Sequence, residues 1–155
     1  MANYVYIATS LDGFIATVDG GIDWLNEIPN PEQSDYGYAE FISGIDAIVM
    51  GRGTFEKVLT FGDWSYEKPV FVLSNSLEEV PEHLAGKVEI IRGEISEVVS
   101  LLNQRGYTNL YIDGGKVIQS FQIVEPLDLI RTLHTHFIEK ILNHRLGHHC
   151  HKTIR

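Results

Sequence analysis

Short apolar runs alternate with segments of helical periodicity along most of the chain. The strand-like runs cover residues 4–9, 47–50, 69–73 and 88–91, and the segment NLYIDGG that begins at Asn109. The helical segments are DYGYAEFISG, which ends at Gly44, and TFEKVLTFG, ISEVVSLLNQRG and KVIQSF. Because strands and helices alternate through short connections, we expect one α/β domain with a mainly parallel sheet and helices on both faces.

The strand at residues 47–50 runs directly into Gly51, Arg52, Gly53 and Thr54, where a helix begins. A helix N-terminus presents free N–H groups and about half a positive charge, and glycines let a phosphate come close. Arg52 adds a charged donor and Thr54 a hydroxyl. The alternative is a tight strand-to-helix turn, with Thr54 as the helix N-cap and Arg52 in solvent.

Two further strands end in small or polar residues. The strand at residues 69–73 is followed by Ser74, Asn75 and Ser76, which suit a phosphate or ribose hydroxyls but are also common turn residues. The segment YIDGGKVI places Gly114 and Gly115 before a helix that opens with Lys116 and Val117. This turn could hold another part of the same ligand, and the alternative is a glycine turn that allows close packing of the helix on the strand. Ligands of such sheets bind outside the carboxyl ends of the strands, so the three turns together predict an extended, phosphate-bearing ligand.

Composition narrows the classes of function. The chain has 155 residues with a formal charge of −9, which argues against a non-specific binder of nucleic acid or of anionic membranes. We find no signal peptide and no apolar run of membrane-spanning length. Cys150 is the only cysteine, so no intrachain disulfide can form, and we expect a cytoplasmic protein. The standard dinucleotide, P-loop and Gly-x-Ser-x-Gly fingerprints do not occur.

The ordered set of motifs resembles the dihydrofolate reductase-like superfamily, and within it the bacterial proteins related to the reductase domain of riboflavin biosynthesis. The motifs are SLDGFIA, GGIDWLNEIPNPE, DYGYAEFISGIDAIVMGRGTFEKV, KPVFVLSNS and LYIDGGKVIQSF. The resemblance implies a three-layer α/β domain that binds NADPH and delivers hydride to a pterin or pyrimidine. It implies an activity like that of dihydrofolate reductase or of 5-amino-6-(5-phosphoribosylamino)uracil reductase, and a homodimer.

The resemblance also implies roles for individual residues. The nicotinamide end would be lined by Ala8, Thr9, Ile15 and Ala16. The phosphates would be held by Gly51, Arg52, Gly53 and Thr54, and the 2′-phosphate would be bordered by Ser74, Asn75 and Ser76. The pyrophosphate would meet Gly114 and Gly115, joined by a cis peptide bond, with Lys116 and Val117 at the start of the helix. An arginine often follows the serine in dihydrofolate reductases, and Asn75 stands there in this chain.

The catalytic prediction rests on one carboxylate. Related reductases often carry an acidic residue in the early helix. Asp35 and Glu40 lie near that place, and Asp35 is the candidate here. The alternative is that Asp35 only caps the helix formed by YGYAEF. The loop carboxylates Asp12 and Asp23 are interpreted as turn residues, and Trp24 as a packing residue.

The end of the chain departs from the family pattern. We expect residues 1–121 to form the reductase-like domain and residues 122–155 to be a divergent tail of that domain. Apolar positions and one histidine of the tail share a helical face, and Pro126 suits a first helical turn, so we expect a helix. These positions are Leu127, Ile130, His134, Phe137, Ile138, Ile141 and Leu142. A shifted reading frame, a truncated variant and a genuinely divergent ending remain alternatives.

Every histidine except His83 lies in this tail, and HHCH ends at His151. Imidazole and thiolate bind transition metals, but adjacent terminal ligands seldom form a closed site, so we predict no metal. The main alternative function is a dinucleotide-binding protein that does not catalyse. A structural or interaction module would require the three polar turns to be coincidental.

Overall fold

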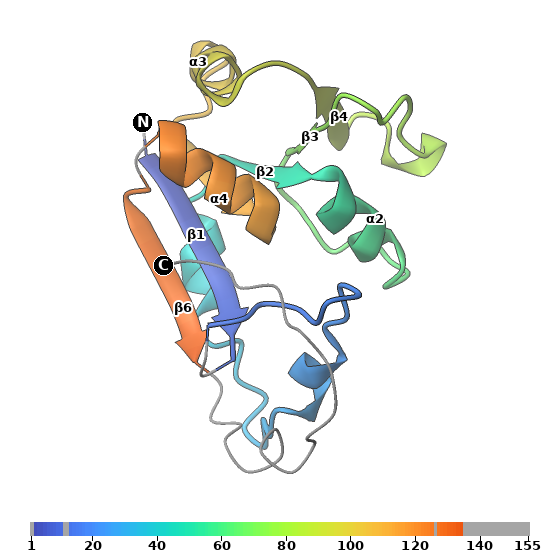
Figure 1. The fold of residues 1–155 in the computed structure, drawn as a ribbon, viewed down its shortest axis with the longest axis vertical. Helices are drawn as coiled ribbons and strands as arrows, with labels where there is room; N and C mark the ends of the chain where they lie inside the picture. The colour runs from blue at the N-terminus through green and yellow to red at the C-terminus, as the bar shows by residue number, and fades with distance from the viewer. Residues whose placement is uncertain (1, 11–12, 126, 135–155) are drawn as a thin grey trace.

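The structure is a computed structural model that describes residues 2–10, 13–125 and 127–134. One sheet contains all its strands, in the order β4-β3-β2-β5-β1-β6, and every neighbouring pair is parallel (Figure 1). The strands are β1 (Ala2–Thr9), β2 (Ala47–Gly51), β3 (Val70–Leu73), β4 (Val88–Ile91), β5 (Asn109–Asp113) and β6 (Leu129–His134). The helices are α1 (Tyr38–Ser43), α2 (Arg52–Leu59), α3 (Ile95–Gln104) and α4 (Gly115–Val124), with short 3₁₀ turns at Asp23–Glu27 and Glu82–Leu84.

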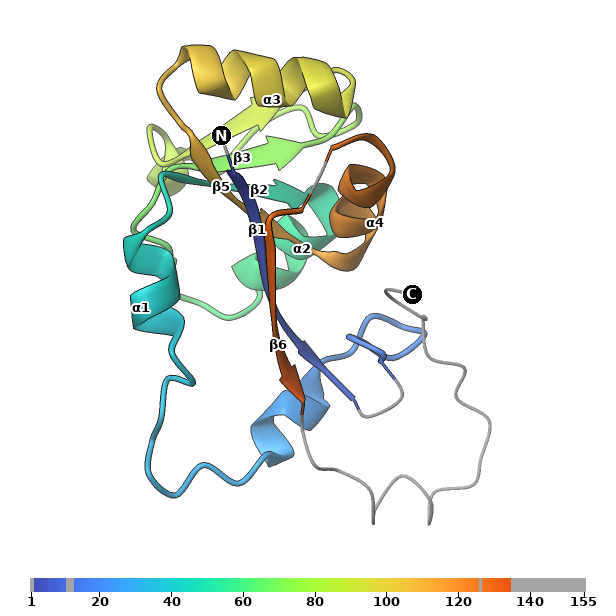
Figure 2. The same ribbon diagram turned by 90° about the vertical axis from the view of Figure 1, so that its left-hand side faces the viewer.

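Two apolar layers cover the faces of the sheet, as the sequence predicts. In β2, Ala47 and Val49 face one layer while Ile48 and Met50 face the other, because successive side chains of a strand point to opposite faces. The first layer includes the apolar faces of α3 and α4, and the second includes those of α1 and α2. Figure 2 shows α1 and α4 on opposite sides of β1 and β6. Each fully buried aliphatic side chain contributes about 1.5–3 kcal/mol, so the two layers hold α2 and α4 firmly against the sheet.

The prediction of a helix after Phe121 is wrong for Leu129–His134. This segment is β6, which pairs in parallel with β1 from Tyr4 opposite Leu129 to Thr9 opposite His134. A free sheet edge offers a row of backbone partners, and pairing with β1 overrides a helical periodicity that spans few turns. The helix α4 continues past Phe121 to Val124, and β6 completes the described sheet. Pro126 and residues 135–155, with most of the histidines and Cys150, lie outside the described residues.

Among the described residues, no helix has the length and apolar character needed to cross a bilayer. The same part of the chain contains no cluster of three or more His, Cys, Asp or Glu side chains arranged to hold a metal ion. The candidate chemistry therefore has to be sought at the ends of the strands.

Candidate functional site

The chain leaves two neighbouring strands, β2 and β5, in opposite directions. From β2 it passes through α2 to β3, and from β5 it passes through α4 to β6 on the far side of β1. Crossovers in opposite directions place the two helices on opposite faces of the sheet, α2 against one apolar layer and α4 against the other. Ligands of such sheets bind outside the carboxyl ends of the strands, at a switch point of this kind. Met50 pairs with Asp113 at this edge, so both glycine turns lie at the switch point.

The two glycine turns pack against each other. A Cβ on Gly51 would lie 2.9 Å from Val117 Cγ2, in the first turn of α4. A Cβ on Gly114 would collide with the Thr54 side chain, whose own Cβ would be 3.2 Å away. Gly114 also has φ 90°, a conformation that side chains other than glycine seldom adopt. Close packing therefore requires glycine at positions 51 and 114, whether or not a ligand binds.

The expected cis bond between Gly114 and Gly115 is contradicted, because the described residues contain no cis peptide bond. A non-proline cis bond costs about 2.5–4 kcal/mol, and the positive φ of Gly114 turns the chain without it. Thr54 is not the helix N-cap either. The helix α2 begins at Arg52 with Gly51 as its N-cap, so Thr54 lies inside the first turn.

Gly53 differs from the other two glycines. It is exposed in the first turn of α2, and a Cβ built on it would meet no atom within 4 Å. Neither packing nor a positive φ requires glycine there. The surface of the first turn of α2 is therefore open at Gly53. A helix N-terminus also has N–H groups without intrahelical partners, so an exposed first turn is compatible with the predicted phosphate.

Arg52 joins two of the predicted turns. Its Nη1 donates to the Ser76 Oγ after β3 at 3.0 Å, and its Nε donates to Glu56 Oε1 at 2.6 Å. The structure thus brings together two residues that are 24 positions apart and that the sequence assigns to one ligand. Glu56, which sequence reasoning missed, lies one helical turn after Arg52.

The other residues of the β3 turn have different surroundings. Ser74 is buried, and its Oγ accepts hydrogen bonds from the backbone N–H groups of Ser76 at 3.2 Å and Leu77 at 3.0 Å. These bonds match the turn role that was the alternative for Ser74. Asn75 is exposed at the tip of the turn, and Lys116 is exposed at the start of α4.

The predicted nicotinamide residues come from the end of β1 and the loop after it. Ala8 and Thr9 are the last two residues of β1, and Thr9 is buried. Ile15 and Ala16 are half-buried, and Ile15 packs against the apolar layer that contains α4. The contact of Ile15 with that layer places the loop on the α4 side of the sheet.

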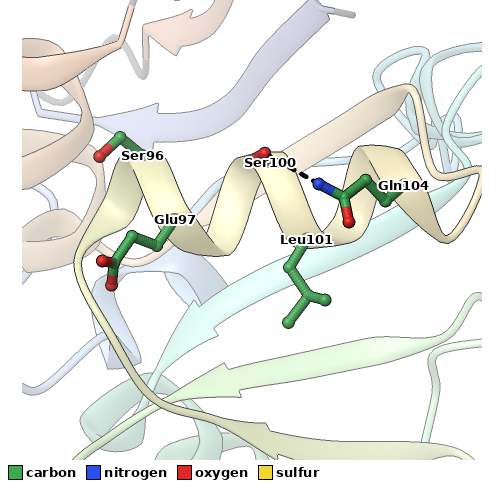
Figure 3. A pocket seen from close by; sticks show the side chains of 5 residues that line it. All are labelled: Ser96, Glu97, Ser100, Leu101 and Gln104. Carbon is green, nitrogen blue, oxygen red and sulfur yellow. Dashed lines mark hydrogen bonds between the residues drawn. The ribbon is translucent and has the colours of Figure 1, made fainter.

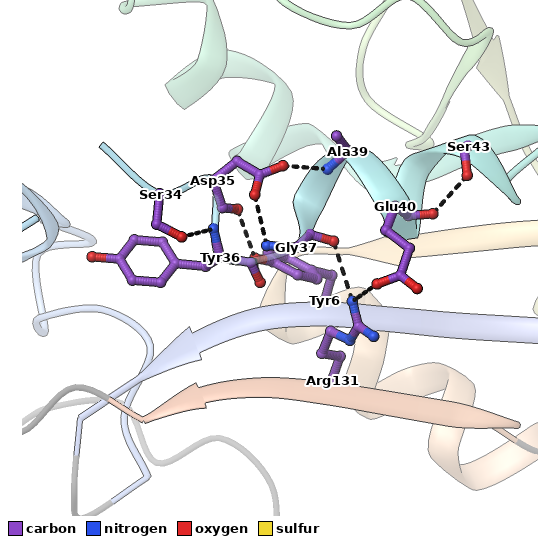
Figure 4. A network of polar contacts seen from close by, with 9 residues as sticks. All are labelled: Tyr6, Ser34, Asp35, Tyr36, Gly37, Ala39, Glu40, Ser43 and Arg131. Carbon is purple, nitrogen blue, oxygen red and sulfur yellow. Dashed lines mark hydrogen bonds and ion pairs between the residues drawn. The ribbon is translucent and has the colours of Figure 1, made fainter. Parts of the chain in front are cut away.

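Asp35 lies in a polar network beside β1 and β6, with its carboxylate turned toward the backbone of α1 (Figure 4). It accepts hydrogen bonds from the N–H groups of Gly37 and Ala39, each at 2.9 Å. These bonds, chiefly the one from Ala39, hold the pKa of Asp35 below its usual value. The N-cap of α1 is Gly37, so Asp35 does not occupy that position, although its carboxylate still accepts from the N–H of Ala39 in the first turn of α1. A catalytic role for Asp35 stays a prediction.

Asp113 is a carboxyl group at the switch point that sequence reasoning did not assign to catalysis. It ends β5 directly before Gly114, and Tyr66 donates its hydroxyl proton to Oδ2 at 3.2 Å. Burial raises the pKa of Asp113 above its ordinary value, although hydrogen bonds, first that of Tyr66, oppose the shift. The available signal was an acidic residue at the end of an otherwise apolar strand. A carboxyl group that keeps its proton above the usual pH range can act as an acid.

Aromatic rings surround this carboxyl group on the α2 side. Trp64 packs edge-on against Tyr66 at 5.3 Å and against Phe55 of α2 at 6.0 Å between ring centroids. The Trp64 Nε1–H is buried without a hydrogen-bond partner among the described residues. Burial is the cause of the raised pKa of Asp113, because a low-polarity environment disfavours the charged carboxylate, whereas the hydrogen bond from Tyr66 opposes that shift.

A separate hollow lies on the outer surface of α3 (Figure 3). All its lining residues come from that one helix, with no contribution from the three turns of the predicted site. They are Ser96, Glu97, Ser100, Leu101 and Gln104. This hollow lacks the converging elements of a ligand site.

The comparisons with known proteins agree with this architecture. The uncharacterised protein YwjB of Bacillus subtilis (strain 168) is 33% identical over 127 residues, which cover 80% of this chain and 70% of that protein. A solved structure from Shewanella sp. PV-4, of a protein provisionally named for riboflavin biosynthesis, has 46% identity and a TM-score of 0.80, covering 86% of this chain and 77% of the other. No family model matches the chain.

A more distant match supports the fold alone. A Thermotoga maritima diaminohydroxyphosphoribosylaminopyrimidine deaminase/5-amino-6-(5-phosphoribosylamino)uracil reductase has a TM-score of 0.61 with 16% identity. The match covers 86% of this chain but 44% of that two-activity protein. The resemblance in the motifs and the similarity in structure therefore point to the same fold.

Proposed function

Because the chain belongs to the dihydrofolate reductase-like superfamily, with the bacterial proteins related to the riboflavin-biosynthesis reductase domain, we propose that it is an NADPH-dependent reductase. Its substrate would be a pterin- or pyrimidine-like heterocycle, the class that includes the substrate in the name of the Thermotoga maritima relative. The observation that carries the proposal is the open first turn of α2 at Gly53, beside Arg52 and opposite the first turn of α4.

Two helix N-termini would hold the cofactor phosphates. Gly53 and Thr54 belong to the first turn of α2, and Gly115 and Lys116 to that of α4. Each turn offers backbone N–H groups that are free of intrahelical partners, and Lys116 adds a positive charge. Gly51, Gly114 and Val117 would shape the floor, since their packing fixes how close the two helices come. Ala8, Thr9, Ile15 and Ala16 would border the nicotinamide end, as the resemblance implies.

The choice of NADPH over NADH would depend on the β3 turn. Arg52 already reaches Ser76 across the gap between α2 and β3 at 3.0 Å, and Ser74 and Asn75 flank that contact. A cation held beside small hydroxyl and amide side chains suits a ribose phosphate. Replacing Arg52 by Ala should weaken NADPH binding more at low salt than at high salt, because salt screens part of the attraction. Equal affinities of variant and parent at low salt would remove Arg52 from the site.

The bound cofactor would supply a hydride to a ring carbon of the substrate. The neighbouring ring nitrogen must then receive a proton, and Asp113 is our candidate donor. Burial raises the pKa of its carboxyl group, which favours the protonated form, and the hydrogen bond that Tyr66 donates to Oδ2 helps to orient the group. After donation the carboxylate would recover a proton from water. Asp35, with its pKa lowered by two backbone hydrogen bonds, is the weaker candidate.

Nucleotide titration and steady-state oxidation of NADPH with pterin and pyrimidine substrates test the proposal. We expect saturable NADPH binding and turnover of at least one substrate class. Binding without turnover on any of these substrates would favour a dinucleotide-binding protein that does not catalyse. A folded sample that binds no dinucleotide would contradict both functions.

A homodimer also remains a proposal. Apolar side chains are exposed near the end of α4 and on β6, at Ile123, Val124, Leu129 and Ile130. Light scattering across a range of protein concentrations would measure the mass in solution, and a monomer throughout would contradict the dimer.

A further inference from the structure

Glu56 forms an ion pair with Arg52, the cation that would bind the proposed 2′-phosphate. It lies on the same face of α2 as Arg52, one turn further along, and its Oε1 is 2.6 Å from the Arg52 Nε. Both side chains are about half exposed, at 48% for Arg52 and 49% for Glu56. The contact therefore lies at the surface, where a ligand can reach it.

The geometry sets up a competition for one guanidinium group. An arginine binds phosphate side-on through Nε–H and one terminal N–H, and Glu56 already holds the Nε–H. The Ser76 Oγ accepts a hydrogen bond from Nη1 at 3.0 Å, which holds the guanidinium beside the β3 turn. A phosphate that approaches side-on must displace the Glu56 carboxylate, whereas the neutral Ser76 hydroxyl can stay and donate to the phosphate.

We propose that Glu56 is a specificity-determining residue, which lowers the affinity of this site for phosphorylated dinucleotide by competing with the 2′-phosphate for Arg52. This inference rests on the proposed function, since it assumes that the α2 turn binds a nicotinamide dinucleotide. NADH has no 2′-phosphate, so Glu56 need not leave Arg52 when NADH binds. The Glu56 carboxylate therefore lowers the affinity for NADPH but not the affinity for NADH, so the two affinities become more similar.

Two effects contribute to the competition. An exposed i,i+4 ion pair on a helix is weak, so its loss opposes phosphate binding only slightly. The displaced carboxylate also remains near the phosphate, and like charges separated by several ångströms at a surface repel each other until salt screens them. Removing the charge of Glu56 should therefore strengthen NADPH binding by about three- to tenfold at low salt.

The test compares Glu56→Gln with the parent by titrating NADPH and NADH separately, at low and at high salt. We expect a gain of about three- to tenfold for NADPH, less than about twofold for NADH, and a smaller NADPH gain at high salt. Glu89→Gln is the matched control, because it removes a half-exposed carboxylate that pairs with Arg105 at 2.8 Å, and neither residue belongs to the three turns of the proposed site. The control should leave both affinities unchanged.

The other possible results of these titrations would contradict the competition in ways that can be distinguished. An unchanged ratio of the two affinities in Glu56→Gln would overturn the competition while leaving the dinucleotide site intact. Weaker NADPH binding would overturn it in favour of a carboxylate that orients Arg52. A folded parent that binds neither nucleotide would contradict the proposed function and the competition together. Thermal unfolding of Glu56→Gln, and the same titrations on Glu56→Ala, exclude a folding defect as the cause.

Discussion

Replacing Gly53 by Ala separates binding from stability at the proposed site. The added methyl group meets no atom within 4 Å, and Gly53 is not among the glycines with positive φ. Alanine is favoured over glycine inside a helix by up to about 1 kcal/mol, and less in the first turn. The free energy of unfolding should therefore rise by about 0–1 kcal/mol, which for a chain of this size raises Tm by up to about 4 °C.

Ligand binding should change in the opposite direction. The methyl group occupies the space through which a phosphate would reach the free N–H groups of α2. We expect NADPH affinity to fall at least tenfold, which corresponds to about 1.4 kcal/mol. The assay is thermal unfolding and NADPH titration on the same preparation.

Gly44→Ala is the matched control for this experiment. Gly44 follows α1, has no positive φ, and its added Cβ would lie 3.9 Å from the nearest atom, the Phe41 carbonyl oxygen. This control should keep both the stability and the NADPH affinity of the parent. An unchanged dissociation constant in Gly53→Ala would refute the reasoning, because it would show that no phosphate approaches the α2 turn.

Three further changes test other parts of the account. Gly114→Ala should cost about 2–4 kcal/mol of unfolding free energy, measured by denaturant titration, because its Cβ collides with Thr54 at a positive φ; an additional Thr54→Ala should restore part of the loss. Asp113→Asn should abolish turnover but keep NADPH affinity. The pKa of Asp113 in the folded protein is raised, so the unfolding free energy of the parent should fall as the pH rises from the ordinary aspartate pKa through the raised pKa. The Asp113→Asn variant should not show that fall. Asp46→Ala should lower the unfolding free energy by about 1–3 kcal/mol, since Asp46 Oδ2 accepts hydrogen bonds from the backbone N–H groups of Thr108 at 2.9 Å and Asn109 at 2.8 Å. The pKa of Asp46 is lowered in the folded protein, so this stabilisation is present above the ordinary aspartate pKa and is lost as the pH falls through the lowered pKa. An unfolding free energy of the parent that does not change with pH would contradict the shifted pKa values of Asp113 and Asp46.

Local sequence patterns were sufficient to predict most of the fold. The strands β1 to β5 and the helices α1 to α4 begin within a few residues of their predicted positions, because apolar periodicity and glycine turns act over short distances. The segment Leu129–His134 fits both a short helical face and a strand. The segment forms a strand because it pairs with the edge of β1, which lies more than a hundred positions earlier in the chain.

Some features of the candidate site could likewise be predicted from the sequence, and others depend on the fold. The turns at Gly51 and Gly114 were visible in the sequence, but the packing of Gly114 against Thr54 and of Gly51 against Val117 depends on the sheet order. Asp113 acquires its raised pKa from burial beside Tyr66, which is 47 positions away. Sequence alone could not supply that environment, because it arises only when β5 and the loop after α2 meet.

A crystal structure of the protein with NADP⁺ would test the central claim most directly. We expect cofactor phosphates against the first turns of α2 and α4, with the 2′-phosphate near Arg52 and Ser76 and the nicotinamide toward the end of β1. Cofactor bound elsewhere on the sheet, or no cofactor at saturating concentration, would contradict the claim.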